Sequence, residues 1–239
     1  MKQNMSQYSI LNSQFFCFEF KGFQKVLISF LIIASFASCK GLQKETIVYK
    51  NDFEGGSLSN IIDGKIGDYN GSKVIGRYSE SGFLLRLDSL PVHNILQISF
   101  DLYIHDTWDG NAAKPEGPDI WIMNIDGWSA IYATMASGLC STCNQSYPIT
   151  QPTIENNRLI FFNYKPNSNA IQTDLPGACK LEGVKGGTVK YRVLRTIEHT
   201  GSKLDLGCYA QLEDPDQANK NCNESWSVDN IKIKAIEFR

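Results

Sequence analysis

The sequence has little histidine, no cluster of positive charge and no apolar run long enough to cross a membrane. Its apolar run 26–38 has thirteen residues, whereas a spanning helix needs about 20. Its 23 Lys and Arg are balanced by 25 Asp and Glu without a basic stripe, so we expect no nucleic-acid partner. Its 8 Pro and 19 Gly form no low-complexity tract, and 42% of the residues are hydrophobic, so the chain can bury a sizeable core.

The signatures of common catalytic sites are also missing. The chain has no G-x-S-x-G, H-E-x-x-H or P-loop sequence, and its three histidines are scattered. His105 and Asp106 are adjacent, but neighbouring strand residues point to opposite faces, so they do not pair as a base with its orienting acid. We therefore expect a protein that is not an enzyme.

The first 38 residues have the parts of an export signal. Lys21 and Lys25 precede the uncharged run 26–38, and small residues follow it up to Cys39. A positive flank, an apolar run of 7–15 residues and a small-residue cleavage site together indicate a secretory signal.

The end of this run indicates the type of signal. Phe36-Ala37-Ser38-Cys39 resembles the lipobox of bacterial lipoproteins of the Bacteroidetes type, in which the cysteine is lipidated. We therefore expect a signal peptide at 1–38, a lipidated Cys39 with a tether at 39–45, and one domain at 46–239. The protein would be exported and held in the outer membrane or at the cell surface by its lipid anchor.

The chain after Cys39 alternates apolar and polar residues with a period of two, which is typical of half-buried strands. The same pattern predicts strands at 46–50, 73–78, 83–87, 95–104, 120–125, 130–135, 159–164, 188–197, 203–212 and 227–238. The last of these changes parity between Ile233 and Ile236, which predicts a bulge. Long loops are expected over 138–168. About ten short strands separated by turn residues predict an all-β, two-sheet antiparallel sandwich of the jelly-roll type.

Three short motifs carry most of the polar residues that are typical of a site. They are N-D-F-E-G-G at 51–56, F-D-L-Y-I-H-D-T-W-D-G-N at 100–111 and N-E-S-W-S-V-D-N-I at 223–231. Together they resemble a loose group of secreted jelly-roll domains that is related to galactose-binding-like and concanavalin-like domains. In carbohydrate-binding members an early Glu and a late Asp share a structural calcium ion, and this resemblance implies that role for Glu54 and Asp229.

Calcium is chemically compatible with these motifs, because it prefers six to eight oxygen ligands. The motif loops are rich in carboxylate and amide oxygens. The alternative is that the same residues only form turns, since Asp and Asn favour turns in any case.

Two tryptophans lie in polar motifs at strand ends. An exposed Trp108 or Trp226 would stack on a sugar ring while Asp106, Asp109 and Asn111 bind its hydroxyl groups. The alternative is that each Trp caps the core, with its N–H bonded to the backbone. We take these five residues as the candidate glycan ligands.

The cysteines after Cys39 are expected to form two disulfides in an oxidising envelope. We favour Cys208–Cys222, which closes the segment before the last strand, together with Cys140 or Cys143 paired to Cys179. The C-x-x-C spacing of Cys140 and Cys143 lies in a loop rather than at a helix N-terminus, so we expect no redox activity.

These features predict a lipid-anchored binding module with a glycan ligand and a structural calcium ion. One alternative is a lipoprotein that binds an envelope protein and has no sugar site. It would expose an apolar patch. A second alternative is a concanavalin-like glycoside hydrolase, which needs two carboxylates about 5–9 Å apart. The E-x-D-x-x-E strand of that class is missing from the sequence.

The anchor is tested by Cys39→Ser. Without a lipidated cysteine the protein should move from the membrane pellet to the soluble fraction after cell lysis, because no other segment is expected to hold it. A variant that stays in the pellet would contradict the lipid anchor.

Overall fold

The computed structural model describes residues 41–214, 216 and 218–238. The predicted signal peptide and Cys39 lie outside the described residues. Within this part no helix is long and apolar enough to cross a membrane. The residues from Leu42 onward form one compact unit.

The described residues form fourteen strands and one short helix. Their bounds are β1 Leu42–Asn51, β2 Ile61–Ile62, β3 Ile66–Tyr69, β4 Ser72–Tyr78, β5 Phe83–Leu87, β6 Ile95–Asp106, β7 Ile120–Ile125, β8 Trp128–Thr134, β9 Thr153–Glu155, β10 Arg158–Ile160, β11 Gln172–Pro176, β12 Lys185–Glu198, β13 Leu204–Gln211, α2 Lys220–Asn223 and β14 Glu224–Phe238.

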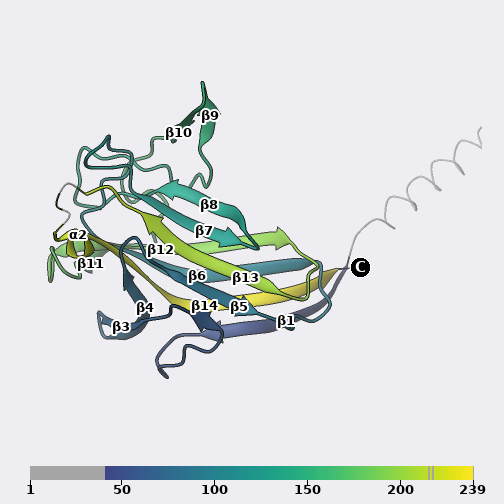
Figure 1. The fold of residues 1–239 in the computed structure, drawn as a ribbon. Helices are drawn as coiled ribbons and strands as arrows, with labels where there is room; N and C mark the ends of the chain where they lie inside the picture. Colours follow the sequence, from purple (N-terminus) through teal and green to yellow (C-terminus); the bar gives the residue numbers. More distant parts are fainter. Residues whose placement is uncertain (1–40, 215, 217, 239) are drawn as a thin grey trace, which may run out of the picture. The chain divides into compact units, whose positions relative to one another are not determined.

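Two antiparallel sheets form a sandwich (Figure 1). The seven-stranded sheet has the order β11-β12-β6-β14-β4-β3, and β1 also pairs with β14. The five-stranded sheet has the order β2-β5-β13-β7-β8. The hairpin β9–β10 projects from the sandwich as a third, two-stranded sheet. The predicted all-β, two-sheet antiparallel architecture is confirmed.

The alternating pattern explains which face of each strand is buried. The even positions of β6 from Leu96 to Ile104 and those of β13 from Leu204 to Ala210 belong to one hydrophobic core between the two main sheets. The odd positions of β6 lie on the outer face of the seven-stranded sheet, where Tyr103 belongs to a separate small cluster. This outer face is therefore where a site can form without disturbing the core.

Some predicted elements differ from the structure. The short strands β2, β3, β9 and β11 were not predicted, because two to five residues carry too few alternations to show a period. Only the first part of the predicted strand 159–164 is a strand, in β10. An irregularity was predicted between Ile233 and Ile236, and there the register of β14 against β1 shifts, between Ile233 and Lys234. Against β6 the register of β14 shifts earlier, between Asp229 and Lys232, around Asn230 with φ 56°.

The cysteine pairing that the sequence favoured is wrong. The structure pairs Cys140 with Cys143 and Cys179 with Cys222, and it leaves Cys208 as a free thiol. Cys208 lies in the middle of β13 with its side chain in the core. It therefore cannot reach Cys222, whose helix α2 lies against the loop that carries Cys179.

Candidate functional site

The outer face of the seven-stranded sheet holds a fixed, neutral histidine. His105 of β6 is fully buried, with Nδ1 3.0 Å from Thr188 Oγ1 and Nε2 2.7 Å from Ser227 Oγ. Burial lowers the pKa of His105 to about 3, with a smaller effect from the positive charge of Arg77. The imidazole is therefore uncharged near neutral pH, and each of its nitrogens has a hydroxyl partner.

A pocket of about 550 Å³ lies over this histidine. Its walls come from the β3–β4 hairpin on one side and from the loop between β11 and β12 on the other, and its lining includes Asp68, Tyr69, Asn70, Arg77, His105, Ala178, Glu182 and Ser227. With Lys65, which also lines the pocket, the lining combines one phenol ring, one imidazole, one guanidinium, one ammonium, two carboxylates, one amide and one hydroxyl group. That mixture suits a polar ligand with many hydroxyl groups.

Tyr69 joins the two walls of the pocket. Its hydroxyl donates a hydrogen bond of 2.6 Å to the carbonyl of Pro176. Its ring meets His105 and Tyr103 edge to face, with centroids 4.6 and 5.4 Å apart. Burial raises the pKa of Tyr69 to about 12, so its hydroxyl stays protonated as a donor. The position of this ring is therefore fixed by three contacts before any ligand binds.

Asp106 builds the second wall instead of binding a ligand. It has φ 68°, and its Oδ1 accepts backbone N–H bonds of 3.2, 3.2 and 3.0 Å from Ala178, Cys179 and Leu181. Its side chain is nearly fully buried, and burial raises its pKa. The prediction that Asp106 contacts glycan is corrected on this ground: a buried carboxylate that holds a loop is not accessible to a sugar.

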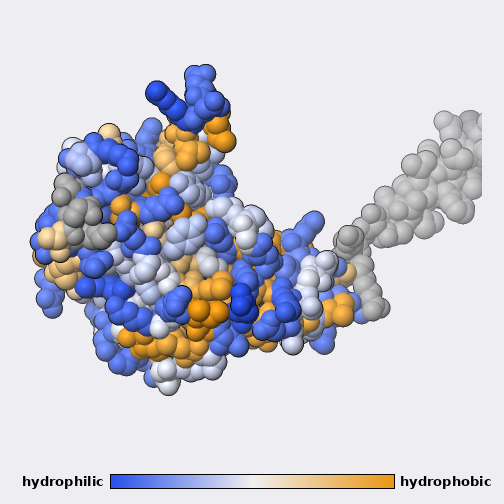
Figure 2. Space-filling view, viewed as in Figure 1, coloured by the Kyte–Doolittle hydropathy of each residue, from blue (hydrophilic) through white to orange (hydrophobic). Residues whose placement is uncertain are grey.

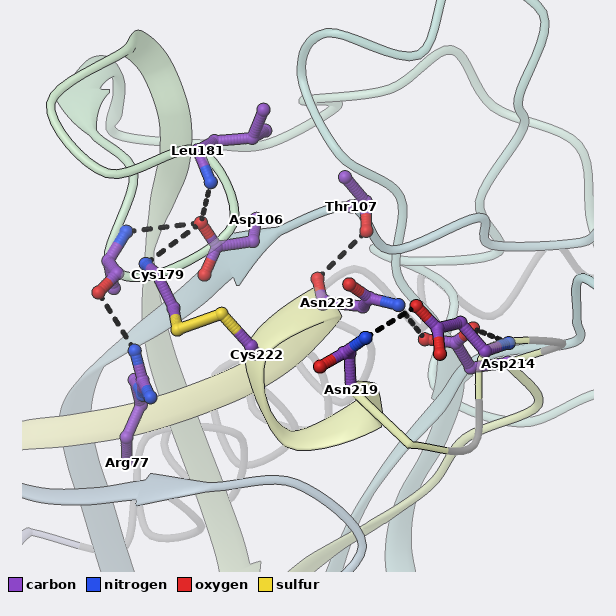
Figure 3. The surroundings of a disulfide bond; sticks show 11 residues. Arg77, Asp106, Thr107, Cys179, Leu181, Asp214, Asn219, Cys222 and Asn223 are labelled. Carbon is purple, nitrogen blue, oxygen red and sulfur yellow. Dashed lines mark hydrogen bonds between the residues drawn. A yellow bond between two sulfur atoms is a disulfide. The ribbon is translucent and has the colours of Figure 1, made fainter.

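Two further contacts fasten the same wall. The disulfide Cys179–Cys222 ties it to α2, and Arg77 donates a bond of 2.8 Å from Nη1 to the carbonyl of Ala178 (Figure 3). The Arg77 guanidinium is thereby oriented within the pocket lining.

The two candidate tryptophans pack inside the molecule. Trp108 and Trp226 are both 0% exposed. Trp108 Nε1 donates to the carbonyl of Ser225 at 3.0 Å, and Trp226 Nε1 donates to the carbonyl of Ser79 at 2.9 Å. The expectation of sugar stacking is corrected for both, because neither indole face reaches solvent. Each caps the core instead, as in the alternative interpretation.

Asp109 and Asn111 line a second, polar pocket of about 420 Å³ among the loops. The Asn111 amide is already used: its Nδ2 donates to Phe162 O at 2.8 Å and to Asn163 Oδ1 at 2.7 Å, and its Oδ1 accepts from Thr134. Asn111 therefore holds a loop in place. The half-buried Asp109 lines the same polar pocket, and its carboxylate does not hold a loop in this way.

The predicted metal ligands Glu54 and Asp229 lie close together around one serine. Ser72 Oγ is 2.6 Å from Glu54 Oε1 and 3.5 Å from Asp229 Oδ2. Burial raises the pKa of Asp229 to about 6, and the negative charges of Asp101 and Glu54 add to this effect. The oxygen donors at this point fit a hard cation such as calcium, which would relieve the repulsion between the two carboxylates.

The pocket residues Tyr69, Arg77, His105 and Glu182 were not among the sequence candidates. The parity of β6 was enough to place His105 on the outer face. Tyr69 and Glu182 lie in short elements without any pattern, so only the tertiary structure brings them to the same pocket.

No protein-family model and no curated protein matches the chain. Among solved structures it is similar to a family 35 carbohydrate-binding module from Clostridium thermocellum, with 10% identity over 80% of this chain and 98% of that chain and a TM-score of 0.33. It is also similar to the C-terminal CBM6 of LamC from Zobellia galactanivorans, with 11% identity, the same coverage and a TM-score of 0.32. A third is the CBM22-2 xylan-binding domain of Xyn10C from Paenibacillus barcinonensis, with 11% identity over 78% of this chain and 98% of that one and a TM-score of 0.33. The resemblance is one of β-sandwich structure alone.

The role of Asp106 is tested by Asp106→Ala. Three backbone N–H groups would lose their acceptor, and a buried unsatisfied donor costs about 1–3 kcal/mol. We expect a loss of about 3 kcal/mol, which lowers the melting temperature by about 6–12 °C in a domain of this size. Asp68→Ala is the control, because its ion pair with Lys73 is exposed and such pairs contribute about 0–1 kcal/mol. Equal melting temperatures for the two variants would contradict the anchoring role.

Proposed function

We propose that this protein is an exported, lipid-anchored carbohydrate-binding module and that the pocket between Tyr69, Arg77 and Glu182 is its glycan site. The observation that carries the proposal is a rigid pocket whose lining is both polar and aromatic. Its volume of about 550 Å³ lies within the range of roughly 300–1,000 Å³ that is common for small-ligand sites. A short saccharide is the ligand class that uses such a lining best.

The arrangement favours recognition over catalysis. Arg77, Asn70 and Glu182 supply donors and acceptors for hydroxyl groups, while Tyr69 supplies an apolar ring edge. Because Tyr69 and Arg77 are held by contacts within the fold, little of their ordering entropy is lost when a ligand binds. A general acid needs a carboxyl group that its surroundings keep protonated. Both carboxylates of this pocket, Asp68 and Glu182, are instead exposed, and Asp68 pairs with Lys73 at 2.5 Å.

Lipidation at Cys39 and calcium at Glu54 and Asp229 belong to the same proposal. The lipobox-like sequence before Cys39 supports the anchor. The shared Ser72 contact and the raised pKa of Asp229 support the metal site. Glu54 and Asp229 would hold the ion, whose function is to fasten the first strand region to β14. This role is structural and places no ion in the glycan pocket.

One observation favours partner-protein binding as a second candidate. The projecting β9–β10 hairpin exposes Ile154, Leu159 and Ile160, with 72, 48 and 41% of their surfaces accessible. Figure 2 shows apolar and polar groups side by side on this projection. An envelope protein that contacts the hairpin would leave the glycan pocket free.

Glycan binding is tested with Arg77→Ala and Glu182→Ala. A hydrogen bond to a charged group contributes about 1.5–3 kcal/mol, so Arg77→Ala should weaken binding to a retained glycan by about 10- to 150-fold. Binding is measured by affinity electrophoresis and calorimetry after a broad glycan screen with the wild type. Glu155→Ala on the β9–β10 hairpin is the matched control and should bind normally. Wild-type binding that survives both pocket variants would place the site elsewhere, and a wild type that retains no glycan would contradict the function.

Calcium at the predicted pair is tested with Asp229→Asn. The variant should bind one calcium ion fewer per chain than the wild type in equilibrium dialysis, because it loses the carboxylate charge that balances the cation. A site that is saturated at 100 times its Kd stabilises the fold by about 2.7 kcal/mol, which corresponds to about 5–11 °C. The variant should lose a shift of this size. Unchanged stoichiometry would remove Asp229 from the metal site.

A further inference from the structure

A second group of carboxylates lies at the end of the sandwich where β6 and β13 end and β7 and β14 begin. Asp109 follows β6, Asp119 directly precedes β7, and Glu224 is the first residue of β14. One carboxylate oxygen from each lies within 4.8 Å of those of the other two. Asp119 is 0% and Glu224 is 2% exposed, whereas Asp109 is half-buried.

The backbone holds these carboxylates in place. Asp119 Oδ2 accepts the N–H of Asp109 at 2.5 Å, and its Oδ1 accepts the N–H of Glu213 at 3.2 Å. A carboxylate oxygen has two lone pairs, so each oxygen of Asp119 can still bind a further group. The N–H contacts orient the side chain but do not use up its capacity.

In the described part of the chain, one oxygen of Glu224 lacks a hydrogen-bond partner. Its Oε2 is fully enclosed and has no hydrogen-bond partner among the described residues. Leaving a buried polar atom unpaired is costly, and the cost is higher for a charged group. Structures rarely retain such an atom unless a water, an ion or a ligand completes it.

Basic side chains do not neutralise the carboxylates of this cluster among the described residues. In the part of the chain that the structure describes, no basic side chain forms an ion pair with Asp109, Asp119 or Glu224. Burial, then the negative charges of Asp119, Asp214 and Asp109, and a side-chain hydrogen bond with Asp119 raise the pKa of Glu224, and burial also raises the pKa of Asp119. By contrast, the buried Asp101 on the outer face forms ion pairs with the partly exposed Lys190 and the exposed Arg192.

We propose that Asp109, Asp119 and Glu224 form a buried binding site for a calcium ion. All three ligands offer oxygen, and oxygens on opposite sides of one calcium ion lie about 4.6–5.2 Å apart for bond lengths of 2.3–2.6 Å. The spacing of the three oxygens therefore allows a single ion to contact each of them. Magnesium is a poorer match, because it demands near-ideal octahedral geometry and retains most of its water.

The ion has a route from solvent. Asp109 lines the polar pocket of about 420 Å³ among the loops, so the cluster is reached through its half-buried member without crossing the core. Bound calcium would tie the segment after β6 to the starts of β7 and β14. This site is separate from the pair Glu54 and Asp229, and it does not rest on the proposed glycan function.

A tryptophan beside the cluster makes the site observable. Trp108 precedes Asp109, and its Nε1 bonds the carbonyl of Ser225, the residue after Glu224. A terbium ion at the cluster should therefore emit light when tryptophan is excited. The test uses the purified full chain, stripped with a chelator and titrated with terbium chloride, with calcium chloride or magnesium chloride as the competitor.

The variants are Glu224→Gln and Asp109→Asn, with Glu155→Gln on the exposed strand β9 as the matched control. The wild type and the control should show tryptophan-sensitised emission that calcium displaces, whereas the two cluster variants should bind terbium and calcium at least about tenfold more weakly. Metal-free Glu224→Gln should melt no lower than the wild type, because burial and the neighbouring acids raise the pKa of Glu224, so the metal-free side chain is a neutral acid that glutamine matches in shape. If it fails to fold, the half-buried Asp109→Asn decides the question.

Three results would overturn the proposal. The first is unchanged emission in both cluster variants, and the second is a wild type without sensitised emission. The third is magnesium that displaces terbium as well as calcium does, which would overturn the choice of ion. Loss of emission in Asp229→Asn, measured in the same way, but in neither cluster variant would assign the signal to the other pair and would also contradict the cluster.

Discussion

The pairing of β6 with β14 is the constraint on which the other features depend. Its ladder places Asp101 opposite Asp229, Tyr103 opposite Ser227 and Asp106 opposite Glu224. The even residues of β6 build the core, so the odd residues must face outward. A shift of one residue in this register would turn every side chain of β6 to the other face and remove the pocket floor, the Asp101–Asp229 neighbourhood and the core together.

The buried acidic side chains of this protein have three kinds of surroundings, and the partners of each acid indicate whether its role is structural. Asp101 is neutralised by Lys190 and Arg192, so it is a completed ion network. Asp106 gives one oxygen to three backbone N–H groups and so acts as a loop anchor. Glu224 has neither kind of partner for its Oε2. An enclosed carboxylate oxygen without a partner needs a proton or a cation. Asp106 Oδ2 is enclosed in the same way, but Asp106 is held by backbone N–H groups through its Oδ1. Glu224 lies beside the carboxylates of Asp109 and Asp119, and this grouping distinguishes the cluster.

Rigidity is the property that the pocket gains from its surroundings. Tyr69 bridges the walls, Asp106 and the Cys179–Cys222 disulfide hold the loop, and His105 is held at both nitrogens. The proposed glycan ligand would offer weak, water-competed hydrogen bonds, so a site that must order itself on binding would lose much of the gain. These contacts order the pocket during folding, before any ligand binds.

Local sequence patterns determined the strands, because burial of one strand face imposes a period of two that is visible without a partner. The ranges 83–87 and 120–125 agree with β5 and β7, and the parity of β6 runs as expected. Exposure and pairing were decided only by the tertiary structure. Trp108 and Trp226 look alike whether they face solvent or a second sheet. The period of two over 203–212 already places Cys208 inward with Leu204 and Leu206, but which cysteines pair with one another was decided by the fold. The physical reason is that burial depends on what covers a face, and the covering side chains come from distant parts of the chain: Trp226 packs against Tyr78 of β4, Phe83 of β5 and Trp121 of β7.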